Sequence, residues 1–211
     1  LQTGAWWQTA FTPEVSPTHW PEAIDAVLQD SVAAHKIADV DVAGFLSGGV
    51  DSSYLAALAR PGRCYTIGYA EPGYDEAIEA ARLAGTLGIE NRVRRITPTE
   101  FWDAIPAVQY HMDEPLADAA AVALYFLNET ASREVKVCLS GEGADEFFGG
   151  YNIYKDPFTA RWYDRLPAGL RRVVGSVAER LPAIPGVNFL VRRARPLEQR
   201  YYRCAALLTE R

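Results

Sequence analysis

Residues 42–53 read VAGFLSGGVDSS, and this stretch decides the fold. Its first five residues are apolar and favour a β-strand, and a helical pattern follows at residues 54–59. The two glycines in between let the backbone turn tightly and approach a ligand closely. Ser52, Ser53 and the free N–H groups at the helix start can donate hydrogen bonds to phosphate oxygens, helped by the helix dipole. The stretch therefore predicts a strand, an anion-binding loop and a helix.

An aspartate, Asp51, lies inside this loop, although a carboxylate repels phosphate. The loop is not of the Walker A type, because the spacing G-x-x-x-x-G-K-[ST] is absent and no lysine follows the glycines. A cation that bridges Asp51 to phosphate oxygens would remove the repulsion. The aspartate therefore predicts that a Mg²⁺ ion binds together with the phosphates. A simple strand-to-helix turn would explain the glycines but not the Asp-Ser-Ser run at residues 51–53.

Outward from this loop, short apolar runs that favour strands alternate with helical patterns. The strand-like runs are residues 40–46, 64–69, 92–96 and 135–139, and the helical patterns are residues 19–32, 54–59, 75–87, 99–112 and 119–131. Such alternation predicts an α/β fold: a doubly wound, mostly parallel sheet with helices on both faces. Functional residues are then expected at the carboxyl ends of the strands. From residue 151 the pattern is wholly helical, with breaks at Pro157, Pro167, Pro182 and Pro196, and predicts a helical appendage.

Composition excludes several classes of protein. The 211 residues are 49% hydrophobic and 23% charged, which supports a buried core and excludes a disordered chain. The longest apolar stretch, residues 119–127, is far shorter than the roughly 20 residues of a membrane-spanning helix. Three widely spaced cysteines, Cys64, Cys138 and Cys204, favour reduced thiols over a disulfide or zinc framework, and so a cytoplasmic location.

Charge is distributed unevenly along the chain. Residues 1–150 contain 9 lysines and arginines against 22 aspartates and glutamates, whereas residues 151–211 contain 12 against 5. The arginines of the second part recur among apolar residues at helical spacing. This pattern favours a solvated helix face, or one that docks on acidic partners, over a nucleic-acid surface.

A second glycine-rich motif follows the last strand-like run. Residues 135–151 read VKVCLSGEGADEFFGGY, with three carboxylates within five residues. In a doubly wound sheet this loop and the first one can converge at the same edge, which makes Asp51 and Asp145 candidate ligands of Mg²⁺. Glu142 is then a candidate for proton transfer. The alternative is an acidic helix start that only complements the helix dipole.

Both motifs resemble a known family. SGGVDSS resembles the pyrophosphate loop of the ATP-pyrophosphatase enzymes, which have an adenine nucleotide alpha hydrolase-like fold and transfer AMP from ATP to a carboxylate or carbonyl oxygen. Synthetases for GMP, NAD, argininosuccinate and asparagine share that loop, as do tRNA-modifying enzymes. SGEGADEFFGGY resembles, nearly letter for letter, the signature SGEG[SA]DE-x-FGGY of the glutamine-hydrolysing asparagine synthetases and their close relatives.

The resemblance implies a set of site residues. Asp51 and Asp145 would bind Mg²⁺, and Glu142 and Asp145 would be catalytic. Residues 113–118 would lie near the acceptor pocket or form an exposed loop, and Asp75 and Glu76 are interpreted as helix caps. ATP would be bound by Phe45, Leu46, Ser47, Gly48, Gly49, Asp51, Ser52, Ser53, Ile67, Ser140 and Gly141.

The chain departs from the family at both ends. It begins at Leu1 without a methionine or a leader, and no cysteine precedes Cys64 to serve as the N-terminal nucleophile of a glutaminase. None of its lysines, Lys36, Lys136 and Lys155, lies in the context of the family's adenylation-site lysine. We therefore expect three parts: a linker remnant from a missing glutaminase domain at 1–18, a nucleotide-binding core at 19–155 and a truncated helical extension at 156–211. The missing parts would complete the site, so the isolated fragment need not be active.

The function implied is an ATP-dependent asparagine synthetase domain. Aspartate, ATP and ammonia would be its substrates, with the ammonia coming from glutamine through the missing glutaminase domain. Three alternatives stay open: a related enzyme that forms an amide or lactam on another carboxylate, a noncatalytic nucleotide-binding module, and an RNA-binding role for the arginine-rich part. A homodimer is also an open alternative.

Overall fold

The computed structural model describes residues 4–5, 18–70, 75–116, 118–182 and 184–202. The predicted lead-in at 1–18 lies almost wholly outside the described residues, as does Cys204. The chain divides into two compact units, Leu1–Gly141 and Glu142–Arg211, which are described separately below. The predicted boundaries at 18 and 155 stay predictions.

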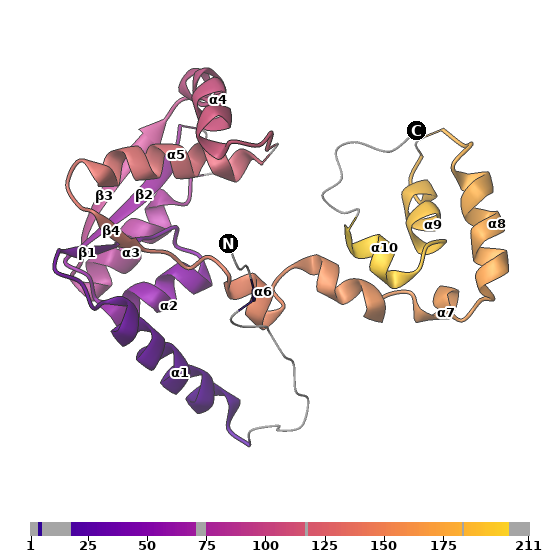
Figure 1. Ribbon diagram of the computed structural model, residues 1–211, viewed down its shortest axis with the longest axis horizontal. Helices are drawn as coiled ribbons and strands as arrows, with labels where there is room; N and C mark the ends of the chain where they lie inside the picture. Colours follow the sequence, from indigo (N-terminus) through magenta and orange to yellow (C-terminus); the bar gives the residue numbers. More distant parts are fainter. Residues whose placement is uncertain (1–3, 6–17, 71–74, 117, 183, 203–211) are drawn as a thin grey trace. The chain divides into compact units, whose positions relative to one another are not determined.

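The first unit is built on a four-stranded parallel sheet (Figure 1). Its strands are β1 (Val42–Phe45), β2 (Arg63–Tyr69), β3 (Glu90–Ile96) and β4 (Val137–Leu139), in the order β3-β2-β1-β4. Gly44 of β1 pairs with Cys64 of β2 on one side and with Leu139 of β4 on the other. The carboxyl ends of β1 and β4 therefore lie next to each other.

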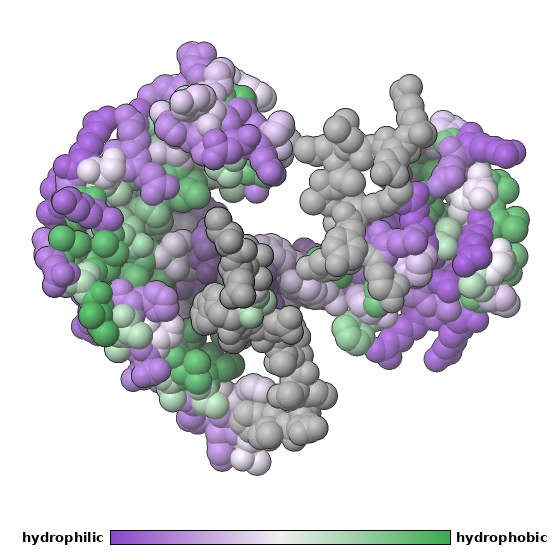
Figure 2. Space-filling view, in the orientation of Figure 1, coloured by the Kyte–Doolittle hydropathy of each residue, from purple (hydrophilic) through white to green (hydrophobic). Residues whose placement is uncertain are grey.

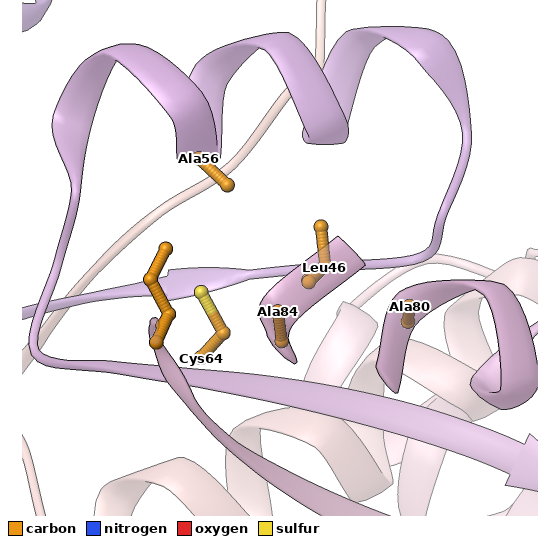
Figure 3. Close-up of a cluster of buried hydrophobic side chains, with 6 residues drawn as sticks. Leu46, Ala56, Cys64, Ala80 and Ala84 are labelled. Atoms are coloured by element: carbon orange, nitrogen blue, oxygen red, sulfur yellow. The ribbon is translucent and has the colours of Figure 1, made fainter. Parts of the chain in front are cut away.

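Helices cover both faces of this sheet. They are α2 (Val50–Ala59), α3 (Ala77–Leu87), α4 (Pro98–Met112) and α5 (Ala119–Ser132), while α1 (Trp20–His35) packs against α2. Residues of α2 and α3 pack on one face around Leu46 and Cys64 (Figure 3). Residues of α4 and α5 pack on the other face, around Ile96 and around Tyr65. The predicted doubly wound α/β fold is confirmed.

The core under α2 and α3 consists mostly of small side chains, including Ala56, Ala80 and Ala84. Cys64 is completely buried there, and burial raises the pKa of its thiol to about 11. Among the described residues, Cys64 and Cys138 are free cysteines, and Cys138 is only half-buried. Within the described ranges, no helix is both long and apolar enough to cross a membrane.

Helix α4 begins at a capping box. Thr97 Oγ1 accepts a hydrogen bond from Glu100 N (3.2 Å), and Glu100 Oε2 accepts one from Thr97 N (2.8 Å). Arg94 Nη2 also donates to Glu100 Oε1 (2.5 Å). The hydrogen bonds from the Thr97 backbone and from Arg94 lower the pKa of Glu100 to about 2.

The second unit is helical, as predicted for the appendage. It contains α6 (Ala144–Phe148), the 3-10 helix η2 (Asn152–Phe158), α7 (Arg161–Asp164), α8 (Ala168–Ala178), α9 (Val187–Arg193) and α10 (Leu197–Tyr202). Pro167, Pro182 and Pro196 lie between helices, whereas Pro157 lies within η2. The prediction of a break at Pro157 was therefore wrong.

Helices α8 and α9 approach each other closely. A Cβ atom at Gly175 of α8 would lie 2.3 Å from the Cβ of Ala194, so only a glycine fits there. Ala178, on the same side of α8, is buried. Figure 2 shows hydrophobic side chains on the surface along α8, where Val173 and Val177 are exposed. The buried side of α8 is therefore the one with small residues.

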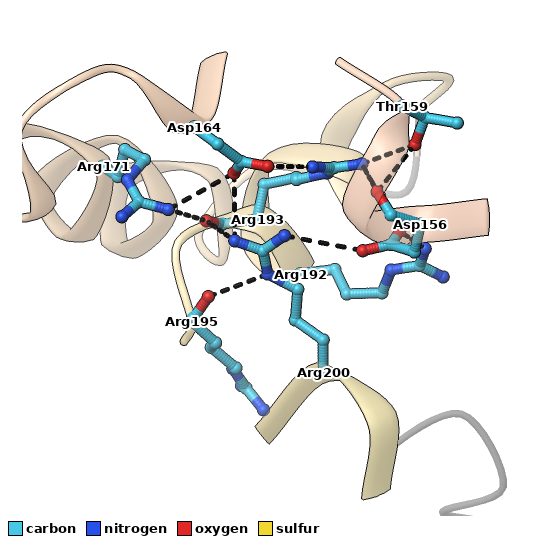
Figure 4. Close-up of polar contacts among 8 residues, drawn as sticks. All are labelled: Asp156, Thr159, Asp164, Arg171, Arg192, Arg193, Arg195 and Arg200. Atoms are coloured by element: carbon cyan, nitrogen blue, oxygen red, sulfur yellow. Dashed lines mark hydrogen bonds and ion pairs between the residues drawn. The ribbon is translucent and has the colours of Figure 1, made fainter. Parts of the chain in front are cut away.

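Two aspartates bind a group of arginines in this unit (Figure 4). Arg193 is 1% exposed, forms an ion pair with Asp164, and donates from Nη2 to the Asp156 carbonyl and to Thr159 Oγ1, both at 2.6 Å. Asp156 and Asp164 together also contact Arg171, Arg192 and Arg200. The contacts join η2, α7, α8, α9 and α10.

This cluster corrects the first branch of the interpretation of the arginine-rich part, the solvated helix face; the second branch, docking on acidic partners, stays a prediction. Arg172 and Arg180 are exposed as that interpretation requires, but Arg193 and Arg200 are buried beside carboxylates of their own unit. Helical spacing does not distinguish an exposed arginine from a buried one. The carboxylates that pair with the buried arginines, Asp156 and Asp164, come from other helices.

We expect Glu100 to make folding sensitive to acid. Its folded pKa lies below its ordinary value of 4.5, so its contribution is fully present above pH 4.5 and is lost as the pH falls toward 2. The wild-type chain should therefore lose more unfolding free energy over this range than Glu100→Gln. Urea denaturation between pH 5 and pH 2.5 measures the difference, and equal losses would contradict it.

We expect Asp156→Asn to destabilise the second unit by about 3–5 kcal/mol, because it leaves buried arginines without their carboxylate. Hydrogen exchange of the α8 and α9 amides in the whole chain measures the loss. Glu179→Gln is the control: it removes an exposed ion pair with Arg195 (3.4 Å) and should cost less than about 1 kcal/mol. Equal effects of the two changes would show that the cluster does not stabilise this unit.

Candidate functional site

The loop after β1 begins at Leu46, whose side chain belongs to the core. The Leu46 side chain is buried beneath α2 and α3, while Leu46 N donates to Tyr65 O of β2 (2.9 Å). The Phe45 side chain packs on the opposite face of the sheet. Both side chains are therefore packed on the sheet where the chain leaves it at the carboxyl edge.

Two serines close this loop by hydrogen bonds. Ser47 N donates to Ser52 Oγ (3.2 Å), and the two hydroxyl oxygens are 2.9 Å apart. Ser52 Oγ donates to Gly49 O (3.2 Å), and Gly49 N donates to Ser47 Oγ (3.3 Å). Because Ser52 gives its one proton to Gly49, Ser47 is the donor between the hydroxyls. The Ser52 side chain is thus held inside the loop.

Gly48 allows this loop to pack against α3. Its φ is +83°, a conformation that L side chains rarely adopt, and a Cβ there would lie 3.0 Å from Ala80 N and from Glu79 Cβ. Both backbone conformation and space therefore require glycine.

The two glycine-rich motifs meet within the first unit. A Cβ at Gly141 would lie 3.1 Å from Ser52 N and 3.3 Å from the Asp51 carbonyl carbon. The second motif therefore begins directly against the first turn of α2. This contact follows from the parallel pairing of β1 with β4.

The donor set at this edge fits a phosphate group. Helix α2 starts at Val50, its N-cap Gly49 makes no side-chain cap bond, and the first N–H groups of a helix have no partner within the helix. Asp51, exposed in the first turn, supplies a carboxylate of the kind that binds Mg²⁺ beside phosphate oxygens. These donors fit a phosphate group. Among the described residues, no group of three or more histidine, cysteine, aspartate or glutamate side chains is placed to hold a metal ion, so Asp51 stays a candidate ligand of Mg²⁺.

Ile67 lies near the carboxyl end of β2 and packs partly buried against α4 and α5. Beside it, a Cβ at Gly68 would lie 2.8 Å from Asp75 Oδ1. Asp75 accepts a hydrogen bond from Ala77 N (3.2 Å), which supports its interpretation as a helix cap. A hydrogen bond from Arg95 (2.5 Å) lowers the pKa of Asp75 below its ordinary value. The roles of Gly68 and Arg95 were not predicted, and neither has a local signal in the sequence.

The other predicted carboxylates, Glu142 and Asp145, belong to the second unit. A Cβ at Gly150 would lie 1.8 Å from Asp145 Oδ1, so this carboxylate folds back over the glycine pair that ends the motif. Tyr151 donates to Glu146 Oε1 (2.9 Å). That hydrogen bond, with the negative charges of Glu146, Asp145 and Glu142, raises the pKa of Tyr151.

Strand order and loop geometry together define the class of fold: a parallel α/β sheet with two glycine-rich loops at its carboxyl edge. The chain belongs to the asparagine synthase family, whose model matches residues 23–208. This confirms the family resemblance of the two motifs.

Two relatives illustrate the extent of the match. Asparagine synthetase [glutamine-hydrolyzing] 1 of Bacillus subtilis is 41% identical over 194 residues, which cover 90% of this chain and 30% of that protein. A putative asparagine synthetase [glutamine-hydrolyzing] of Mycobacterium tuberculosis is 44% identical over 186 residues, 86% of this chain and 28% of that protein. The chain thus spans less than a third of the length of these curated relatives.

Among solved structures, the NH3-dependent NAD synthetase of Campylobacter jejuni is similar, with a TM-score of 0.43 and 14% identity. The match covers 90% of this chain and 99% of that one.

We expect Gly48→Ala to cost about 1–3 kcal/mol of unfolding free energy, because alanine is strained at a positive φ. The new methyl group would also press on α3. Gly62→Ala is the control, since a Cβ there meets nothing within 4 Å. Urea denaturation of both variants tests this, and similar stabilities would show that the loop does not require glycine at position 48.

Proposed function

We propose that this chain is the synthetase part of an ATP-dependent amide-forming enzyme that converts aspartate to asparagine. The observation that carries the proposal is the packing of Gly141, from the second motif, against the Ser52 nitrogen of the first. Family membership supports the same activity.

ATP would lie across the carboxyl edge of the sheet. Ser47, Gly48, Gly49, Ser52 and Ser53 would surround its phosphates. The first N–H groups of α2 and the Ser53 hydroxyl would donate to them, while the Ser47 and Ser52 hydroxyls hold the loop in shape. The backbone at Phe45 and Leu46, with Ile67, Ser140 and Gly141, would bind the adenine and ribose. Asp51 and Asp145 would hold Mg²⁺, which when bound neutralises charge on the pyrophosphate.

The reaction would proceed in two displacements. A side-chain carboxylate oxygen of aspartate attacks the α-phosphorus, which forms an acyl-adenylate and breaks the bond to pyrophosphate. Ammonia then attacks the acyl carbon, and AMP leaves. Glu142 would take the proton that the attacking nitrogen loses, with Asp145 beside it. The loop contributes mainly by orienting the α-phosphorus toward the carboxylate.

The whole protein would obtain its ammonia from glutamine. The two relatives described above are named as glutamine-hydrolysing, and each is more than three times as long as the matched segment. We propose that residues 1–18 connect to a glutaminase domain, that 19–155 form the nucleotide-binding core and that 156–211 begin a longer helical region. The reaction would take place in the cytoplasm.

Product analysis tests this function. The chain, and a longer protein that contains it, are incubated with Mg²⁺, ATP, ammonium and L-aspartate, and AMP, pyrophosphate and asparagine are quantified. We expect equal amounts of AMP and asparagine, at least from the longer protein. AMP formation with other carboxylic acids but not with aspartate would indicate a different acceptor, and ATP binding without AMP formation would indicate a noncatalytic module.

We expect Glu142→Gln to lower the rate of amide formation roughly 10²- to 10⁴-fold, as loss of a general acid or base does. Asp51→Asn should lower AMP and asparagine formation together. Asp30→Asn, on the exposed side of α1, is the control. Unchanged rates in Asp51→Asn or Glu142→Gln would show that the assigned role is wrong.

A further inference from the structure

Thr66 is a buried polar residue in the middle of the sheet. Its side chain, on β2, is 1% exposed, and its Oγ1 donates a hydrogen bond to Leu46 O (2.6 Å). The side-chain amide of Asn91, at the start of β3, lies 2.9 Å from the same Oγ1. The Thr66 hydroxyl thus contacts both Leu46 and Asn91, but it has only one proton to donate.

Counting protons fixes the direction of these bonds. Thr66 has one hydroxyl proton, and this proton goes to Leu46 O, because a backbone carbonyl oxygen can only accept whereas the Asn91 amide can also donate. With Oδ1 toward Thr66, Asn91 would leave its buried Nδ2 without a partner among the described residues. Rotating the amide by 180° lets Nδ2 donate to Thr66 Oγ1, and a carbonyl oxygen is less costly than an N–H to leave unpaired. The proton donors therefore run from Asn91 to Thr66 to Leu46.

This chain of donors ends at the peptide group that opens the loop. Leu46 C=O and Ser47 N–H belong to one planar peptide. Thr66 holds its oxygen, and Ser52 Oγ accepts from its nitrogen at 3.2 Å. The orientation of that peptide is thus fixed from both sides by side-chain hydroxyls. A rotation of the peptide would also move the Ser52 hydroxyl.

We infer that Thr66, oriented by Asn91, is a positioning residue for the phosphate-binding loop. It touches no predicted ligand itself. It acts through the Leu46–Ser47 peptide, which sets the direction of Ser47 N–H and the place of the Ser52 hydroxyl. The consequence for ATP binding rests on the proposed function, whereas the consequence for loop order does not.

Two measurements test this inference. Hydrogen exchange of the Ser47, Gly48 and Gly49 amides in the nucleotide-free chain reports loop order, and calorimetric titration with Mg²⁺ and ATP reports affinity. Thr66→Val removes the hydroxyl at nearly constant volume. It should speed loop exchange several-fold relative to exchange in β3, and weaken ATP binding about 3- to 10-fold, the effect of losing one hydrogen bond.

Two further variants separate positioning from general stability. Thr66→Ser keeps the hydroxyl and should restore both readouts to within about twofold of the wild type. Thr130→Val removes a similar hydroxyl bond in α5, to Phe126 O (2.8 Å), and should change neither loop exchange nor affinity. If Thr130→Val matches Thr66→Val, or if Thr66→Val changes only the melting temperature, the inference is wrong.

Asn91→Asp tests the direction of the proton. An ionised carboxylate only accepts, so it would draw the Thr66 proton away from Leu46 O and should loosen the loop as Thr66→Val does. Loop exchange as slow as in the wild type would overturn the assigned direction. If the wild-type chain binds no ATP, the proposed function fails, and the exchange comparison still decides the inference.

Discussion

The close approach of Gly141 to the backbone at the start of α2 is the constraint on which the site depends. Parallel pairing of Gly44 with Leu139 places the ends of β1 and β4 side by side. Gly141 follows β4 closely in the chain, and a Cβ atom added to it would lie 3.1 Å from Ser52 N. A side chain at Gly141 or Gly48 would occupy the space between the loops and their neighbours. Because Gly48 and Gly141 lack side chains, the first N–H groups of α2 lie close to both glycine-rich loops.

Different interactions stabilise the interior of each of the two units. In the first, alanines and other small apolar residues of α2 and α3 pack closely on the sheet, so burial of apolar surface dominates. In the second, short helices are joined through Asp156, Asp164 and their arginines. Buried ion pairs are weak evidence for high stability, but removing one partner is costly because the other charge stays buried. The arrangement of these short helices therefore depends on a few charged residues.

Local sequence patterns predicted most elements of the first unit and erred mainly at their ends. Strands β2 and β3 begin earlier than their apolar runs, at Arg63 and Glu90, because these two residues pair across the strands (3.2 Å) and continue the ladder with charged side chains. Helix α2 begins at Val50, four residues before its helical pattern, since Gly49 serves as its N-cap. A pattern of apolar residues does not detect the polar residues that belong to a strand or a helix.

The sequence by itself determined the class of fold, the family and the residues of the two glycine-rich loops, because short motifs and periodicity are local properties of the chain. Tertiary structure alone decided that Gly141 lies against Ser52, that Arg193 is buried, and that Thr66 and Asn91 support the Leu46 carbonyl. Each of these contacts joins residues more than 15 positions apart. Such contacts depend on strand order, register and helix packing, which no local pattern of residues specifies.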